Sequence, residues 1–212
     1  MSALRHLPNI LTFARIPAVG VIAWWTYLAG PWASAALALF IVAAITDLLD
    51  GWVARKVGAV SDFGRLMDAL VDKIFILGLL VTLLALDCLP VSTIGPEGPT
   101  PASPEARLIA ALGVFAILTR EFLITGLRLV AAAKGQVLEA EGWGKSKTFL
   151  QILAIGHLIG LRAYETHWNL SDLWHGHWET IISGLFWASV GLTVWSGAVY
   201  IFRHRRHLPG LS

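Results

Sequence analysis

Residues 46–73 read TDLLDGWVARKVGAVSDFGRLMDALVDK and cover the junction between two long apolar segments, 32–55 and 62–87. Each segment is long enough for a membrane-spanning helix, which needs about 20 predominantly apolar residues. The connection around Gly58 is short, so the two helices are expected to be antiparallel neighbours. This stretch therefore predicts a helical hairpin with one polar end.

Four aspartates are carried at that polar end, two on each predicted helix. Asp47 and Asp50 fall within about 60° of each other on a helix that turns about 100° per residue. Asp68 and Asp72 are four residues apart and also share a face. The hairpin therefore predicts that four carboxylates converge between the two helices at one depth.

Such a cluster needs neutralisation, because one Asp at the centre of a span costs about 2.5–3.5 kcal/mol and like charges repel. Mg²⁺ and Mn²⁺ prefer hard oxygen ligands, and four carboxylates can hold two such ions. Small residues at Gly51, Ala54 and Gly64 leave room for a ligand to approach the backbone. The alternative is an interfacial acidic cluster that pairs with nearby cations, but two spaced pairs with glycines favour the metal site. Those cations are Arg55, Lys56, Arg65 and Lys73.

The whole 212-residue chain has the composition of a membrane protein. Hydrophobic residues make up 56% of it and charged residues 14%, whereas soluble domains are nearer one quarter charged. Residues 90–104 are rich in Pro, Gly, Ser and Thr, and residues 164–179 are mainly polar and aromatic. Both segments are therefore expected to be loops. The sequence thus predicts an all-α, polytopic membrane protein with six transmembrane helices in a single domain, 1–212. The spans are 9–29, 32–55, 62–87, 105–130, 147–164 and 180–202.

The basic residues predict the orientation. With six spans both termini lie on one side, and that side collects fourteen of the 16 Lys and Arg residues. The positive-inside rule then places the termini and the aspartates at the cytoplasmic face of the cell (inner) membrane. The first apolar segment is too long for a signal peptide and lacks a cleavage site, so it is expected to be retained. The net charge of +2 gives no reason to expect a nucleic-acid partner.

The fixed positions of the hairpin read Asp47-x2-Asp50-Gly51-x2-Ala54-Arg55-x8-Gly64-x3-Asp68-x3-Asp72. This pattern resembles the signature of the CDP-alcohol phosphatidyltransferases, and every fixed position is present. The resemblance implies a six-helix membrane enzyme, often a homodimer, that displaces CMP from a CDP-linked lipid with an alcohol.

The resemblance also implies the roles of the aspartates. Asp47, Asp50 and Asp68 would hold one divalent ion, and Asp47, Asp68 and Asp72 would hold a second. Asp72 would in addition act as the general base on the attacking hydroxyl. Paired ions of this kind can neutralise a diphosphate and stabilise its leaving oxygen.

Two groups of residues are candidates for binding CDP-diacylglycerol. The resemblance assigns the nucleotide or its diphosphate to Gly51, Arg55 and Ser61. The first span adds polar residues at a spacing of three, and these are interpreted either as further nucleotide contacts or as a helix cap and an interfacial arginine. They are Asn9, Thr12 and Arg15.

A basic group further along the chain is the candidate binding site for the acceptor alcohol. Arg120, Arg128, Lys145 and Lys147 suit a phosphorylated acceptor, because guanidinium binds phosphate bidentately and ammonium binds it as a point charge. A neutral acceptor would not call for four cations. The alternative is a set of cations that face lipid head groups. An ion pair with Glu121 is expected to hold Arg120 in place.

Three segments resemble the phosphatidylglycerophosphate synthase branch of the family: PNILTFARIP (8–17), TREFLITGLR (119–128) and GWGKSKTFLQ (142–151). This resemblance implies transfer of the phosphatidyl group of CDP-diacylglycerol to sn-glycerol 3-phosphate, giving phosphatidylglycerophosphate and CMP in phospholipid biosynthesis. Two alternatives stay open: a relative that uses inositol phosphate, another phosphorylated alcohol or a second phospholipid, and a cation or proton transporter that uses the aspartates as its relay.

The remaining reactive side chains carry weaker signals. Cys88 is the single cysteine, which excludes an internal disulfide. His167, His175 and His177 lie in the second predicted loop among tryptophans. They are interpreted as solvated residues of an aromatic belt in preference to a metal site.

Overall fold

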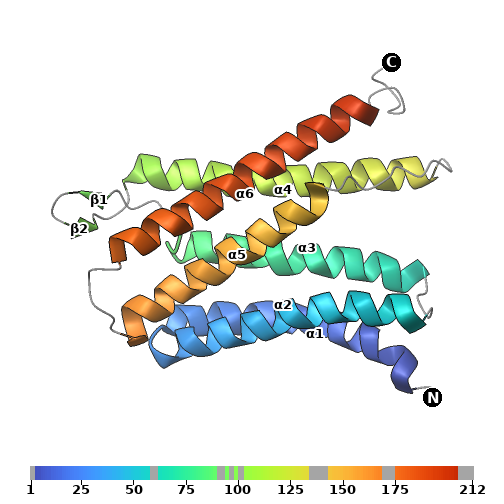
Figure 1. Ribbon diagram of the computed structural model, residues 1–212, viewed down its shortest axis with the longest axis horizontal. Helices are drawn as coiled ribbons and strands as arrows, with labels where there is room; N and C mark the ends of the chain where they lie inside the picture. Colours follow the sequence, from blue (N-terminus) through green and yellow to red (C-terminus); the bar gives the residue numbers. More distant parts are fainter. Residues whose placement is uncertain are drawn as a thin grey trace. The chain divides into compact units, whose positions relative to one another are not determined.

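A computed structural model describes residues 3–57, 62–89, 94–95, 98–99, 103–133, 143–168 and 175–204. Within these residues it has six α-helices, drawn in Figure 1. They are α1 (Ala3–Leu28), α2 (Pro31–Val57), α3 (Asp62–Ala85), α4 (Pro104–Ala133), α5 (Trp143–Ala163) and α6 (His175–His204). The all-helical architecture predicted from the apolar segments is therefore confirmed.

The two predicted loops are wrong in part. The first contains a two-residue antiparallel pair, β1 (Ile94–Gly95) with β2 (Gly98–Pro99). In the second, the chain leaves α5 through a π-helical turn, η1 (Tyr164–Trp168), and α6 begins at His175. The Thr166 hydroxyl donates to the Arg162 carbonyl at 2.6 Å, which uses a carbonyl at the end of α5.

Two of the described helices are long and apolar enough to cross a membrane, Pro104–Ala133 and Thr180–His204. A shorter apolar helix covers Pro31–Thr46. Large apolar side chains point outward from the two long helices, including Phe115, which is 64% exposed, and Phe202, which is 68% exposed. Apolar helices with apolar outer faces are expected in lipid. The count of six spans stays a prediction.

The chain divides into two compact units, and the first comprises residues 1–89 and 155–178. In this unit α1 packs along both α2 and α3 (Figure 1). The rings of Phe40 and Phe75 stack at a centroid distance of 5.8 Å and an angle of 4°, which joins α2 to α3. This contact supports the predicted helical hairpin.

The turn between α1 and α2 is attached to η1. Ala29 and Gly30 both have left-handed backbone, with φ of 59° and 56°, so the chain reverses there within two residues. The Gly30 amide donates to the Thr166 hydroxyl at 2.8 Å, and the Ser34 hydroxyl lies 2.7 Å from His167 Nδ1. His167 is exposed, as predicted, whereas the side chains of His175 and His177 lie outside the described residues.

The second unit comprises residues 90–154 and 179–212. Its helices α4 and α6 approach closely at Gly113, where an added Cβ would lie 3.3 Å from the Phe186 ring. Ile117 and Ile182 are fully buried in the same unit. The division concerns compactness alone, so the prediction of a single domain stays a prediction.

Candidate active site

The four aspartates lie on helical backbone at the spacing that the sequence predicts. Asp47 and Asp50 belong to α2, which continues as helix to Val57, and Asp68 and Asp72 belong to α3. The i,i+3 and i,i+4 pairs therefore each share a helix face. The side chains of Asp47, Asp50 and Asp68 lie outside the described residues, as do those of Gly51, Arg55, Asn9 and Thr12 and the whole of Ser61.

The stacked rings of Phe40 and Phe75 show which residues of α2 and α3 lie at the same height along the hairpin. Asp47 follows Phe40 by seven residues, and Asp68 precedes Phe75 by seven residues. Seven residues are close to two helical turns, so each aspartate lies on the same face as its phenylalanine and about 10 Å along the axis. Because the two helices are antiparallel, the step forward from Phe40 to Asp47 and the step back from Phe75 to Asp68 both lead toward the α2–α3 turn. Backbone positions 47 and 68 are thus brought to one level of the hairpin.

Asp72 is held by an arginine from the first helix. Arg15 Nη1 lies 2.9 Å from Asp72 Oδ1, with the Arg15 side chain 4% exposed and that of Asp72 44% exposed. The Arg15 side chain is therefore buried in an ion pair. This disagrees with the interpretation of Arg15 as an interfacial arginine. The ion pair crosses from α1 to α3, and sequence spacing cannot reveal it because 57 residues separate the partners.

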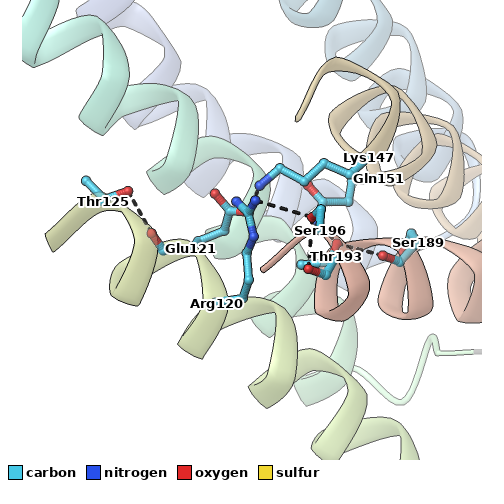
Figure 2. Close-up of polar contacts among 8 residues, drawn as sticks. All are labelled: Arg120, Glu121, Thr125, Lys147, Gln151, Ser189, Thr193 and Ser196. Carbon is cyan, nitrogen blue, oxygen red and sulfur yellow. Dashed lines mark hydrogen bonds and ion pairs between the residues drawn. The ribbon is translucent and has the colours of Figure 1, made fainter. Parts of the chain in front are cut away.

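A second charged cluster lies among α4, α5 and α6 (Figure 2). Arg120 Nη1 donates to Glu121 Oε1 at 3.1 Å, which confirms the predicted ion pair. Lys147 Nζ binds the same carboxylate oxygen from α5. The three side chains are only 14%, 13% and 6% exposed in the order Arg120, Glu121 and Lys147. Two of the four predicted cations therefore meet on one carboxylate.

The other two predicted cations are Arg128 and Lys145. Arg128 is exposed on α4, two turns beyond Arg120. The side chain of Lys145, at the start of α5, lies outside the described residues. Among the members of the predicted basic pocket whose side chains the structure describes, Arg120 and Lys147 are therefore the two that are largely shielded from solvent.

A row of hydroxyl groups on α6 accompanies this cluster, and the sequence analysis missed it. The Arg120 guanidinium donates through Nη2 to Ser196 Oγ at 3.2 Å, and Gln151 Nε2 donates to Thr193 Oγ1 at 3.1 Å. The hydroxyls of Ser189, Thr193 and Ser196 all donate back to carbonyls of their own helix (Figure 2). The signal was available, since hydroxyl residues recur at a spacing of three or four in an apolar segment.

Arg120, Glu121 and Lys147 bring two positive side chains and one negative side chain together. They are poorly hydrated, and charges in such an environment are costly unless they are paired and hydrogen-bonded. Guanidinium and ammonium are both groups that bind phosphate.

Comparisons with known proteins agree with the signature in the hairpin. Residues 5–195 match the CDP-alcohol phosphatidyltransferase family. A Bacillus subtilis protein named CDP-diacylglycerol--glycerol-3-phosphate 3-phosphatidyltransferase is 34% identical over 196 residues, which cover 84% of this chain and 91% of that protein.

Two plant relatives are longer than this chain. An Arabidopsis thaliana chloroplastic/mitochondrial protein with the same enzyme name, numbered 1, is 33% identical over 94% of this chain. A rice protein named cardiolipin synthase (CMP-forming) is 33% identical over 93% of this chain. The matches span 63% and 57% of those two proteins. The family match covers most of the sequence, and the chain belongs to the CDP-alcohol phosphatidyltransferase family.

Proposed function

We propose that the protein transfers the phosphatidyl group of CDP-diacylglycerol to sn-glycerol 3-phosphate, releasing CMP. The observation that carries this proposal is the largely buried cluster in which Arg120 and Lys147 share Glu121. A phosphomonoester dianion is the kind of acceptor that a guanidinium and an ammonium placed side by side would bind. The names of the Bacillus and Arabidopsis relatives support the same acceptor.

The acceptor site would use these cations in different ways. Arg120 would bind two phosphate oxygens through its planar guanidinium, and Lys147 would add a compact charge. Arg128 and Lys145 are proposed as further contacts of glycerol 3-phosphate. A neutral alcohol has no anionic oxygen for these cations to bind, which disfavours acceptors without a phosphate.

The aspartates are proposed to bind two divalent cations, Mg²⁺ or Mn²⁺. The donor set consists of carboxylates only, which suits hard cations, and the register of α2 and α3 supports a common level for Asp47 and Asp68. When bound, such ions would neutralise the diphosphate and the charge that develops on the leaving oxygen.

Asp72 is proposed to take the proton from the attacking hydroxyl. A carboxylate is a weak base, so its positioning must contribute much of the effect. Arg15 supplies that positioning from α1, and the 44% exposure of Asp72 leaves its carboxylate accessible. The nucleotide or diphosphate of CDP-diacylglycerol is proposed to be bound by Gly51, Arg55 and Ser61, from the family resemblance. Asn9 and Thr12 are proposed as further contacts, from their spacing in the first span.

The topology proposed for this reaction follows the distribution of charge. Six spans would place both termini and the charged residues at the cytoplasmic side of the inner membrane. The lipid tails of the donor would then stay in the bilayer while its nucleotide reaches the cytoplasm. A homodimer is proposed from the family resemblance.

An acceptor panel tests the proposed function. Purified protein in detergent with CDP-diacylglycerol and Mg²⁺ or Mn²⁺ is given glycerol 3-phosphate, glycerol, inositol phosphate or phosphatidylglycerol, and CMP release is measured. We expect release with glycerol 3-phosphate alone. Release with phosphatidylglycerol would favour the second candidate, the activity named for the rice relative. Release with glycerol would contradict the role of the cations, and the absence of all release would favour a transporter.

A further inference from the structure

The Arg120 side chain packs against the backbone of α6 at Gly197. A Cβ added at Gly197 would lie 2.7 Å from Arg120 Cγ, closer than carbon atoms can approach without displacement. The contact involves the middle of the arginine side chain, so a shift there moves the whole guanidinium. Gly197 thus provides the space in which this conformation of Arg120 is possible.

The neighbouring residue binds the other end of the same side chain. Ser196 is 2% exposed, and its hydroxyl donates to the Thr193 carbonyl at 3.0 Å. With its proton used in this way, the Ser196 oxygen faces Arg120 as an acceptor, and Nη2 donates to it at 3.2 Å. Ser196 therefore sets where one edge of the guanidinium lies (Figure 2).

Glu121 binds the opposite edge of the guanidinium, at Nη1. The two terminal nitrogens are thus held from two helices, by Glu121 on α4 and by Ser196 on α6. A bidentate contact with phosphate depends on the plane of the guanidinium. Its orientation is consequently part of the recognition of the acceptor.

We propose that Ser196 and Gly197 are positioning residues for acceptor recognition. They fix Arg120 against α6, and they thereby determine the affinity and selectivity for the phosphate of the acceptor alcohol. This inference rests on the proposed function, because it takes Arg120 as the residue that binds that phosphate.

Gly197→Ala tests the space that Arg120 occupies, with Gly191→Ala as its matched control. Gly191 lies on the same helix, and nothing lies within 4 Å of the position of an added Cβ there. Alanine is the better helix former at both positions, so a weaker helix cannot explain a loss. We expect Gly197→Ala to raise the KM for glycerol 3-phosphate at least about tenfold, the scale of one charge-assisted hydrogen bond.

Ser196→Ala tests the acceptor oxygen, with Ser189→Ala as its matched control. Both serines are buried on α6 and both hydroxyls donate to a carbonyl of that helix, but Ser196 is the one that accepts from Arg120. We expect a higher KM for glycerol 3-phosphate in Ser196→Ala and an unchanged one in Ser189→Ala. In all four variants the KM for CDP-diacylglycerol should stay within about twofold of the wild type.

The outcomes separate the two proposals. If the wild type releases CMP with glycerol 3-phosphate and Gly197→Ala behaves like Gly191→Ala, the positioning role is wrong while the proposed function stands. Equal changes in both KM values would mean general disruption and would also overturn it. If the wild type does not use glycerol 3-phosphate, the proposed function fails and this inference fails with it.

Discussion

Asp72 and Glu121 are two carboxylates with different surroundings, and these surroundings suggest different tasks. Asp72 is partly exposed and is bound by Arg15, so its carboxylate is accessible to an incoming hydroxyl. Glu121 is nearly buried and bound to two cations, so it acts as a fixed structural anion. The same functional group is thus accessible in one unit and enclosed in the other.

Replacing Asp72 with asparagine is predicted to abolish turnover. Asn keeps the size of the side chain but cannot accept the proton, and loss of a general base lowers rates by about 10²–10⁴-fold. Initial rates of CMP release measure the effect. Asp87→Asn is the control, because Asp87 is exposed, has φ of 52°, and Asn tolerates that conformation. Full activity in a folded Asp72→Asn protein would remove Asp72 from the role of base.

Replacing Glu121 with glutamine is predicted to destabilise the protein. Arg120 and Lys147 would lose their shared counter-charge, and breaking a buried ion pair from one side costs about 3–5 kcal/mol. A thermal unfolding scan in detergent should show a lower Tm, and inorganic phosphate should restore part of it by binding both cations. Glu105→Gln removes an exposed carboxylate that is hydrogen-bonded locally at the start of α4, and should lower the Tm much less. A variant that phosphate does not stabilise would argue against the phosphate site.

At the scale of elements, an aromatic contact joins the described parts of α2 and α3. The stacked rings of Phe40 and Phe75 relate the two helices, and the aspartates follow two turns away. Replacing a buried Phe with Ala costs about 3–5 kcal/mol. Loss of this contact should also disturb the alignment of the aspartates on α2 with those on α3.

Phe40→Ala is therefore predicted to lower the Tm and to raise the Mg²⁺ concentration needed for half-maximal activity. Ile41→Ala is the matched control, since Ile41 is the next residue of α2 and is 46% exposed. Titration of Mg²⁺ into a metal-depleted sample measures the difference. Equal metal requirements in the two variants would show that this contact does not control the aspartates.

Sequence alone predicted the six helices and the Arg120–Glu121 pair, because apolar length and adjacent opposite charges are local signals. It did not predict that Arg15 binds Asp72, that Lys147 joins Glu121, or that Ser196 accepts from Arg120. These contacts join helices that are distant in sequence, and helical periodicity identifies a face without identifying its partner. The short β1–β2 pair and η1 were missed because Pro- and Gly-rich or polar segments carry little periodicity.

At the scale of the whole molecule, the single cysteine reports on the proposed topology. Cys88 follows the end of α3, on the side that the positive-inside rule places outside the cytoplasm. Burial raises the pKa of the Cys88 thiol above its ordinary value of 9.0, and the charge of Arg162 opposes this shift. The neutral thiol therefore persists to higher pH, and the reactive thiolate is scarce near neutrality.

A membrane-impermeant maleimide added outside intact cells is predicted to label Cys88 slowly at neutral pH and faster as the pH rises toward the thiol pKa. Denaturation should remove the burial and accelerate labelling at neutral pH. Cys88→Ser provides the background. Labelling only after the cells are opened would reverse the proposed orientation.

The carboxylate shared by Arg120 and Lys147 has a consequence for the competition between anions at the proposed acceptor site. A bare pair of cations would collect chloride and other monovalent anions, and each would compete with the substrate. Because Glu121 binds both cations from within the chain, a monovalent ion must compete with this carboxylate, whereas a doubly charged ester brings two negative charges to the competition. Potassium chloride should consequently inhibit turnover by the wild type less than turnover by a variant that lacks the Glu121 carboxylate.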